Sequence, residues 1–322
     1  MKVNFTKKLI SAAAIVLACC TMGACANEAH VAFYPFWREN VSATQYKLNE
    51  ELTYDVSFTP TEISSNRNYT LDYKDGVYKT SLTLNKSEDG QSFYYVYKTE
   101  LTITACFTFN GETKSYQDQI VTETAFADDT TLKPTYSVKS IKSNSPTNAS
   151  VSKIEECANP YEYEIRTEYN ESCTQGTSIV TPKGEEARTT NFEIDSSKRN
   201  YLDNEQLLFA LRGIDPTINP QSDLQVYAPF TRQMQTIGVR FSNIVGADFT
   251  FALNGASEKR TVQYYPVNIA ITGKYPGATQ TMWVASQKNA AFRNVILKLE
   301  TPLSYDLGTL TYTLNSATFS NQ

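Results

Sequence analysis

From residue 52 onward, apolar and polar side chains alternate along the chain with a period of two. The clearest case is residues 93–109, where the intervening positions are largely lysine, glutamate and threonine. Alternation of this kind predicts strands that bury one face and expose the other to water. The apolar parity of this run contains Phe93, Tyr95, Tyr97, Leu101, Ile103, Phe107 and Phe109.

The length of this run predicts a large sheet. Seventeen residues of unbroken strand span roughly 55 Å, where about 5–6 residues is typical, and long strands need a twisted, curved sheet. Further alternation occurs at 161–165, 237–241, 265–271, 295–299 and 310–314. Turns are predicted at Lys74-Asp75-Gly76, Asn110-Gly111 and Asn254-Gly255. We therefore predict a mainly β fold, built as a large curved antiparallel sheet or half-barrel.

One segment, residues 203–212, breaks the strand pattern and predicts a short helix. Asp203 can cap its first turn with Gln206 completing a capping box, and Gly213 can close it. Apolar side chains leave no polar face on its second half, so the helix should be buried, across the concave side of the sheet. These side chains are Leu207, Leu208, Phe209 and Leu211.

The first 24 residues have the features of a secretory signal peptide. Three lysines precede an uncharged apolar run at 9–22, and Gly23-Ala24-Cys25 follows. The junction resembles a bacterial lipobox, which implies acylation at Cys25. Acylation at Cys19 and plain cleavage after Ala26 are the alternatives. We expect a signal peptide at 1–24, a tether at 25–45 and one β-rich domain at 46–322. The protein would then be secreted and held by its N-terminal lipid on the outer side of a bacterial cell membrane or envelope.

Composition argues against several kinds of chemistry. Removal of the signal's three lysines takes the formal charge from −5 to −8, which opposes binding to nucleic acid. The only histidine, His30, lies in the expected tether, and no Gly-rich phosphate loop occurs. We therefore predict no metal, no cofactor and no enzyme activity. The domain's odd number of cysteines predicts free thiols at Cys106, Cys157 and Cys173.

The densest group of acids is compatible with two interpretations. A pair of carboxylates could serve a glycoside hydrolase. The even spacing of Glu162, Glu164 and Glu168 within one predicted strand favours the alternative, a solvated strand face. The group contains Glu155, Glu156, Glu162, Glu164 and Glu168.

Four short motifs, in this order along residues 46–314, resemble a bacterial envelope domain family of uncharacterised function. They are E-x-L-x-Y-x-V from Glu50 to Val56, T-L-x-P from Thr131 to Pro134, D-x-x-x-L-L-x-x-L-R from Asp203 to Arg212, and Trp283-Val284-Ala285-Ser286. The resemblance implies a fold similar to that of lipoprotein carriers, in which a helix closes a curved antiparallel sheet over an apolar cavity. The family has no established activity to carry over.

These observations favour a lipid-anchored, non-catalytic envelope protein that binds a lipophilic or envelope-derived ligand. The alternatives are a surface adhesion or assembly module and, less favoured, a carboxylate-based glycoside hydrolase. A ten-residue helix covers only about 15 Å, so it leaves part of the long strand uncovered. We expect a groove there, lined by some of Phe93, Tyr95, Tyr97, Leu101 and Ile103.

Overall fold

The computed structural model describes residues 30–38, 48–61, 67–88, 90–195, 197, 200–272, 279–286, 292–303 and 307–321. The expected signal peptide, Cys19 and Cys25 lie outside the described residues. The strands are β1 (Leu48–Pro60), β2 (Thr70–Lys86), β3 (Phe93–Phe109), β4 (Glu112–Ala127), β5 (Pro134–Pro146), β6 (Ala158–Tyr169), β7 (Gln175–Pro182), β8 (Arg188–Glu193), β9 (Gln221–Ala228), β10 (Gln233–Phe241), β11 (Val245–Leu253), β12 (Ala256–Thr272), β13 (Gln280–Ala285), β14 (Ile296–Pro302) and β15 (Gly308–Asn321). The helical segments are η3 (Ile154–Glu156), α1 (Leu207–Ala210) and η4 (Leu211–Gly213).

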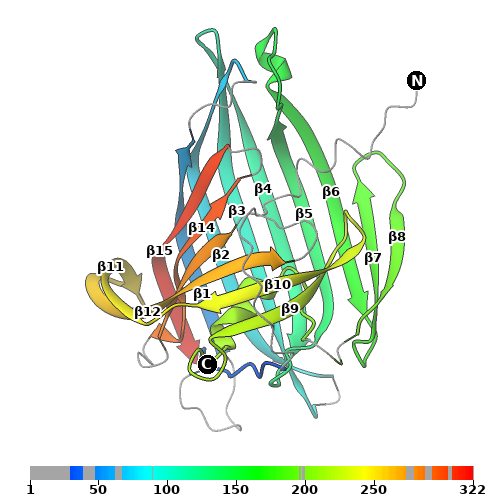
Figure 1. Ribbon diagram of the computed structural model, residues 1–322, viewed down its shortest axis with the longest axis vertical. Coiled ribbons are helices and arrows are strands. Elements are labelled where there is room, and N and C mark those ends of the chain that lie inside the picture. Colours follow the sequence, from blue (N-terminus) through cyan, green and yellow to red (C-terminus); the bar gives the residue numbers. More distant parts are fainter. Residues whose placement is uncertain are drawn as a thin grey trace.

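All fifteen strands belong to one sheet, in the order β8-β7-β6-β5-β4-β3-β2-β1-β15-β14-β13-β12-β10-β9, with β11 beside β12 and β15. The parallel contact of β11 with β15 closes strands β11–β15 into a five-strand barrel, and the other strands are bonded outside it. Figure 1 shows β3–β6 side by side as a tall wall. The predicted mainly β class, with a large curved antiparallel sheet and one short helix, is confirmed.

The predicted long strand and two of the predicted turns are confirmed. β3 spans Phe93–Phe109, and Asn110-Gly111 connects it to β4 with positive φ at both residues (49° and 82°). Asn254-Gly255 connects β11 to β12 in the same way (49° and 86°). The turn predicted at residues 74–76 is wrong, because β2 continues through it with a bulge between Lys74 and Val77. A Cβ on Gly76 would lie 2.7 Å from Val56, so glycine allows a close approach there instead.

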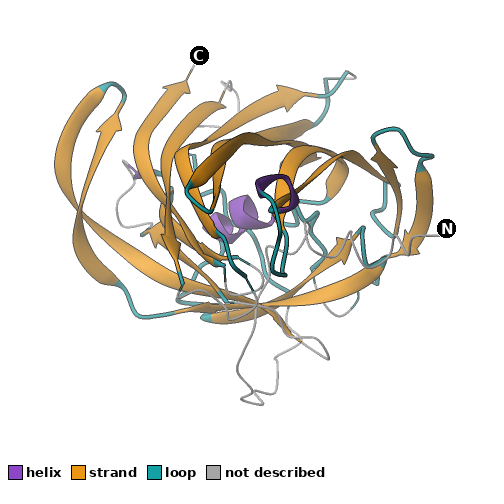
Figure 2. Cartoon of the chain, turned by 90° about the horizontal axis from the view of Figure 1, so that it is seen from above, coloured by secondary structure: helices purple, strands orange, loops and turns teal. Residues whose placement is uncertain are grey.

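The predicted helix is present but shorter than expected. α1 and η4 together cover 207–213, and residues 204–206 form a turn. The capping box does not form, because the Gln206 side-chain amide donates to the Leu132 carbonyl (2.8 Å) instead of closing on the helix start. Leu207 and Leu211 are buried, whereas Leu208 is only half-buried. Figure 2 shows the helical segment inside the ring of strands, as predicted.

Residues 30–38, which we name the N-terminal strap, pack against the core although they fall within the expected tether. Val31, Phe33 and Trp37 are 1–3% exposed. The Trp37 ring lies 4.6 Å from that of Phe209, and the Tyr34 amide donates to the Gly213 carbonyl (2.7 Å). The core therefore includes Val31, Phe33 and Trp37, which the sequence analysis assigned to the expected tether at 25–45. The segment is too short for its pattern of apolar side chains to predict a buried element.

The three cysteines of the domain are free and buried. Cys157 precedes β6 and Cys173 follows it, so a twelve-residue strand separates them. They belong to different clusters, Cys157 beside Phe107 and Cys173 beside Tyr201. Within the described residues, no helix is long and apolar enough to cross a membrane.

Candidate ligand cavity

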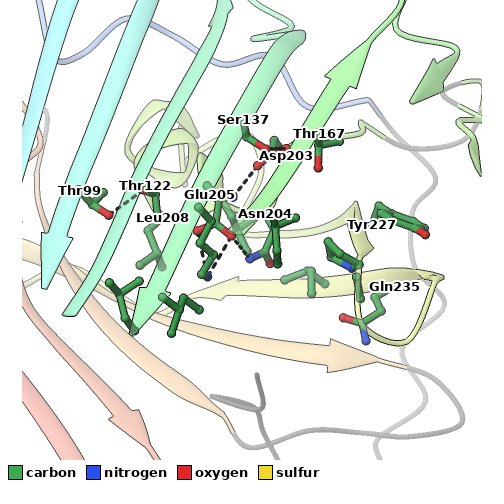
Figure 3. Close-up of a pocket in the computed structure, with 18 of the residues that line it drawn as sticks. Thr99, Thr122, Ser137, Thr167, Asp203, Asn204, Glu205, Leu208, Tyr227 and Gln235 are labelled. Carbon is green, nitrogen blue, oxygen red and sulfur yellow. Dashed lines mark hydrogen bonds and ion pairs between the residues drawn. The ribbon is translucent and has the colours of Figure 1, made fainter. Parts of the chain in front are cut away.

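A cavity of about 510 Å³ lies between the inner face of the long strands and the helical segment (Figure 3). Strands β2–β6 provide one wall, and β9, β10, β12, β14 and β15 provide the facing wall. The walls are mainly aliphatic and aromatic, because each strand turns its apolar parity inward. Among these side chains are Tyr78, Tyr97, Leu101, Ile120, Ile141, Ile165, Ile237, Ile269, Leu299 and Tyr312, with Leu207 and Leu208 from α1.

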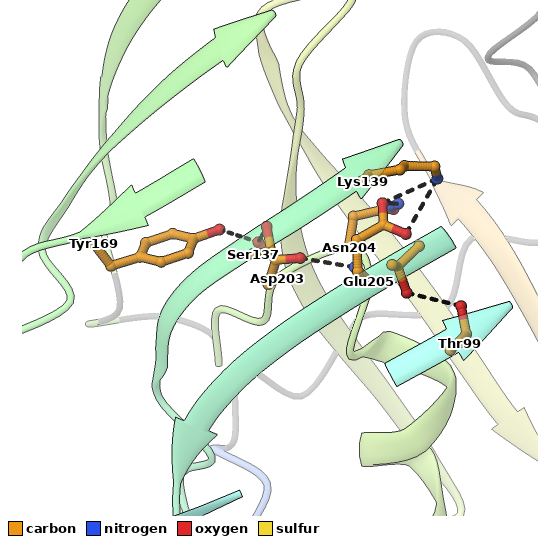
Figure 4. Close-up of polar contacts among 8 residues, drawn as sticks. Thr99, Ser137, Lys139, Tyr169, Asp203, Asn204 and Glu205 are labelled. Atoms are coloured by element: carbon orange, nitrogen blue, oxygen red, sulfur yellow. Dashed lines mark hydrogen bonds and ion pairs between the residues drawn. The ribbon is translucent and has the colours of Figure 1, made fainter. Parts of the chain in front are cut away.

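An ion pair of Lys139 and Glu205 lies in the cavity wall (Figure 4). The ammonium nitrogen is 3.0 and 3.1 Å from the two carboxylate oxygens, and the Asn204 amide donates to one of them (3.0 Å). The Lys139 side chain is 22% exposed and that of Glu205 is 14% exposed. Lys139 shares its strand parity with Ser137 and Ile141, which also line the cavity, so β5 turns a charge inward.

A second carboxylate, that of Asp203, is buried beside this pair. Asp203 Oδ2 accepts hydrogen bonds from Ser137 (2.6 Å) and Tyr169 (2.5 Å), and Oδ1 accepts one from the Glu205 amide (2.8 Å) (Figure 4). Burial, and secondarily the charge of Glu205, raise the pKa of Asp203 above its usual value. Because these partners lie on β5, on β6 and in the turn before α1, Asp203 fixes that turn against the two strands.

The Tyr163 hydroxyl is an unpaired polar group at the cavity. Tyr163 lines the cavity and is 4% exposed, and its hydroxyl has no hydrogen-bond partner among the described residues. Its ring packs edge-on against Phe230 at 4.8 Å. Burial raises the pKa of Tyr163 far above the ordinary range, so the hydroxyl keeps its proton. A buried donor without a partner costs about 1–3 kcal/mol, which a ligand acceptor would offset.

A third charged contact, between Glu50 and Arg212, is buried at the C-terminal end of the helical segment. The guanidinium donates to both Glu50 oxygens (2.6 and 2.8 Å) and to the carbonyls of Asn294 and Arg293 (3.0 Å each). Both side chains are at most 2% exposed. Glu50 and Arg212 come from two of the motifs that carried the family resemblance. A third motif contributes the Leu132 carbonyl that Gln206 binds, so these motifs meet around the helical segment.

Of the five residues predicted to line a groove, the structure places Tyr97 and Leu101 in the cavity wall. Tyr95 packs against Trp37, Phe126 and Phe209, because the helical segment and the strap fill that end of the sheet. Ile103 is buried in the same core cluster, and Phe93 packs against it partly buried.

The acidic residues singled out in the sequence lie away from the cavity wall. Glu162 pairs with Lys183 (2.7 Å) and Glu168 with Arg166 (2.8 Å), both largely exposed, and Glu155 and Glu156 lie in η3. The residues that sequence reasoning missed are Lys139, Glu205 and Tyr163. The one available signal was a lysine on the inward parity of a strand. Among the described residues, no cluster of histidine, cysteine and acidic side chains could hold a metal ion.

No family model matches the chain, and no curated protein matches its sequence. Among solved structures, the chain is similar to a crystal structure from Brucella abortus described as a beta-barrel-like protein of a domain of unknown function. The two share 9% sequence identity with a TM-score of 0.48, over 85% of this chain and 99% of that one.

Proposed function

We propose that this protein is a lipid-anchored, non-catalytic binding protein of the bacterial envelope, and that its cavity holds a lipophilic or envelope-derived ligand. The observation that carries the proposal is the cavity of about 510 Å³ beneath the helical segment. Ligand sites commonly measure about 300–1,000 Å³ and combine apolar walls with a few polar groups. A curved sheet closed by a helix over such a cavity is the arrangement that the resemblance to the envelope domain family implies.

The polar groups of the cavity favour binding over hydrolysis. A glycosidase needs two carboxylates with access to the substrate. Asp203 is 3% exposed with both oxygens bonded. Both oxygens of Glu205 are occupied by Lys139. Neither carboxylate is placed to exchange a proton with a sugar.

The exposed apolar side chains give the adhesion alternative little support. Adhesion through an aromatic patch requires aromatic side chains gathered on the surface. The large apolar side chains exposed in the described part of the chain are Val121, Ile218, Met234 and Val245, none of them aromatic.

An environment-sensitive apolar dye tests the proposal. We expect saturable binding by the wild-type protein and its loss in Leu101→Glu, because the new carboxylate would stand in the apolar wall. Val121→Glu is the matched control, since Val121 is 39% exposed on the neighbouring strand. Thermal melts check that both variants are folded.

Two outcomes of the dye experiment contradict the proposal. Absence of dye binding by the folded wild type would favour the adhesion alternative. Equal loss of binding in Leu101→Glu and Val121→Glu would show that the dye reports on the surface rather than on the cavity.

A further inference from the structure

The two ends of the sheet, β8 and β9, come together without a strand ladder among the described residues. The Phe192 and Tyr227 rings stack across this junction with centroids 3.8 Å apart and planes 6° apart. Tyr169 and Tyr201 belong to the same hydrophobic cluster, and their hydroxyls lie 3.0 Å apart. We name Phe192, Tyr227, Tyr169 and Tyr201 the seam. Tyr169 and Tyr227 also line the cavity, so these two seam residues belong to its wall and the seam borders the cavity.

Among the described residues, backbone hydrogen bonds join β9 to the chain after β8 at one place. The Gln225 amide of β9 donates to the Asn200 carbonyl, and the Leu202 amide donates to the Gln225 carbonyl (2.9 Å each). By contrast, the register of β5 with β6 covers eleven residue pairs. A wall held by side chains and two backbone bonds separates at lower cost than a full ladder, so the seam is the weak line of the sheet.

The N-terminal strap begins at the same place. Val31 exchanges two hydrogen bonds with the Asn200 side-chain amide (2.8 Å each), and the His30 ring lies 3.1 Å from the Ser197 carbonyl. Val31 is therefore fixed beside the residue that bridges to β9. Between Cys25 and Val31 the chain spans at most about 22 Å, at about 3.3–3.6 Å per residue. An acyl group on Cys25 would keep Val31, which is bonded to Asn200 beside the seam, within that distance of the lipid surface.

We propose that the seam is the entrance through which an acyl chain passes from the membrane into the cavity, with the N-terminal lipid holding the entrance against the bilayer. This inference rests on the proposed function, because it names the ligand class and the route for the same cavity. The acyl chain would lie along the isoleucine-rich walls. Its polar end would reach the Lys139–Glu205 pair and the unpaired Tyr163 hydroxyl.

The test measures transfer of a pyrene-labelled fatty acid from phosphatidylcholine vesicles to the full-length, acylated protein. Phe192→Ala removes one half of the ring stack but no residue of the cavity wall. We expect it to speed uptake roughly two- to tenfold, the range that loss of one aromatic pair allows, with an unchanged Kd. Phe249→Ala is the matched control, because this half-exposed phenylalanine loses an aromatic pair with Tyr264 away from the cavity wall.

Two further variants separate the possible failures. Cys25→Ser should bind the free probe with wild-type affinity but take it from vesicles more slowly. The inference is overturned if Phe192→Ala and Phe249→Ala exchange probe at the same rate. It is also overturned if Phe230→Ala, at the turn after β9, is the variant that speeds uptake. Absence of probe binding by every folded form would instead overturn the proposed function itself.

Discussion

The helical segment carries a charged contact at each end, and the two contacts differ in their access to solvent. Before α1, Glu205 pairs with Lys139 in the cavity wall, and the two side chains are 14% and 22% exposed. After α1, Arg212 pairs with Glu50, and neither side chain is more than 2% exposed. Residues 203–213 therefore connect two environments. One end lies in the fully buried core around Arg212, and the other lies at the partly exposed cavity wall around Lys139.

The difference lies in how the charges are compensated. Arg212 has four hydrogen bonds to Glu50 and to the carbonyls of residues 293 and 294, which replace the water lost on burial. Lys139 has only Glu205 as its hydrogen-bond partner in the described structure, and its exposed fraction lets cavity water solvate it. The Glu50–Arg212 pair is closed to solvent, whereas the Lys139–Glu205 pair lies in the cavity wall and is partly exposed.

The largest expected effect on stability is that of breaking the buried Glu50–Arg212 ion pair. Arg212→Met should lower the free energy of unfolding by about 3–5 kcal/mol, because it leaves the Glu50 carboxylate buried without its partner. Urea unfolding measures this loss. The double variant Glu50→Leu/Arg212→Met should recover part of it, since both charges are then absent. A loss below about 1 kcal/mol in Arg212→Met would contradict the importance of the pair.

A smaller effect distinguishes two leucines of the helical segment. Leu211 is fully buried, so Leu211→Ala should cost about 2–5 kcal/mol. Leu208 is half-buried and faces the cavity, so Leu208→Ala should cost clearly less, because its methyl groups already border an open space. Thermal melts of the two variants under the same conditions measure the difference. Equal shifts would mean that the cavity end is packed as tightly as the buried end.

Much of the fold could be predicted from the sequence, because it depends on local patterns. The period of two in residues 93–109 depends only on which side chains face water, and Asn110-Gly111 needs only the positive φ that these residues tolerate. The bulge at Gly76 could not be predicted, since it depends on the close approach of Val56 from a neighbouring strand. The burial of the strap likewise depends on Phe209 and Thr130, far away in the sequence.

The candidate site could be predicted only in part. Tyr97 and Leu101 line the cavity, because they lie on the inward parity of β3. Tyr95 shares that parity, yet it is covered by the strap, which the sequence placed in a tether. The partners Lys139 and Glu205 are 66 residues apart in the chain. No local pattern pairs them, since their contact arises from where the 203–213 segment crosses the sheet.

The smallest expected effect on stability is that of breaking the Lys139–Glu205 ion pair. Lys139→Met should change the free energy of unfolding by no more than about 1 kcal/mol, because a partly solvated pair contributes little and Glu205 keeps its bond from Asn204. The same variant should alter binding of the pyrene-labelled fatty acid, since it removes the one lysine of the described cavity wall. We expect weaker binding, because the carboxylate of the probe would lie beside Lys139. Glu205→Gln is the matched control, because it leaves the ammonium in place and should not weaken binding. A loss of stability as large as that of Arg212→Met would contradict the comparison, since it would show that the Lys139–Glu205 pair is as necessary to the fold as the Glu50–Arg212 pair.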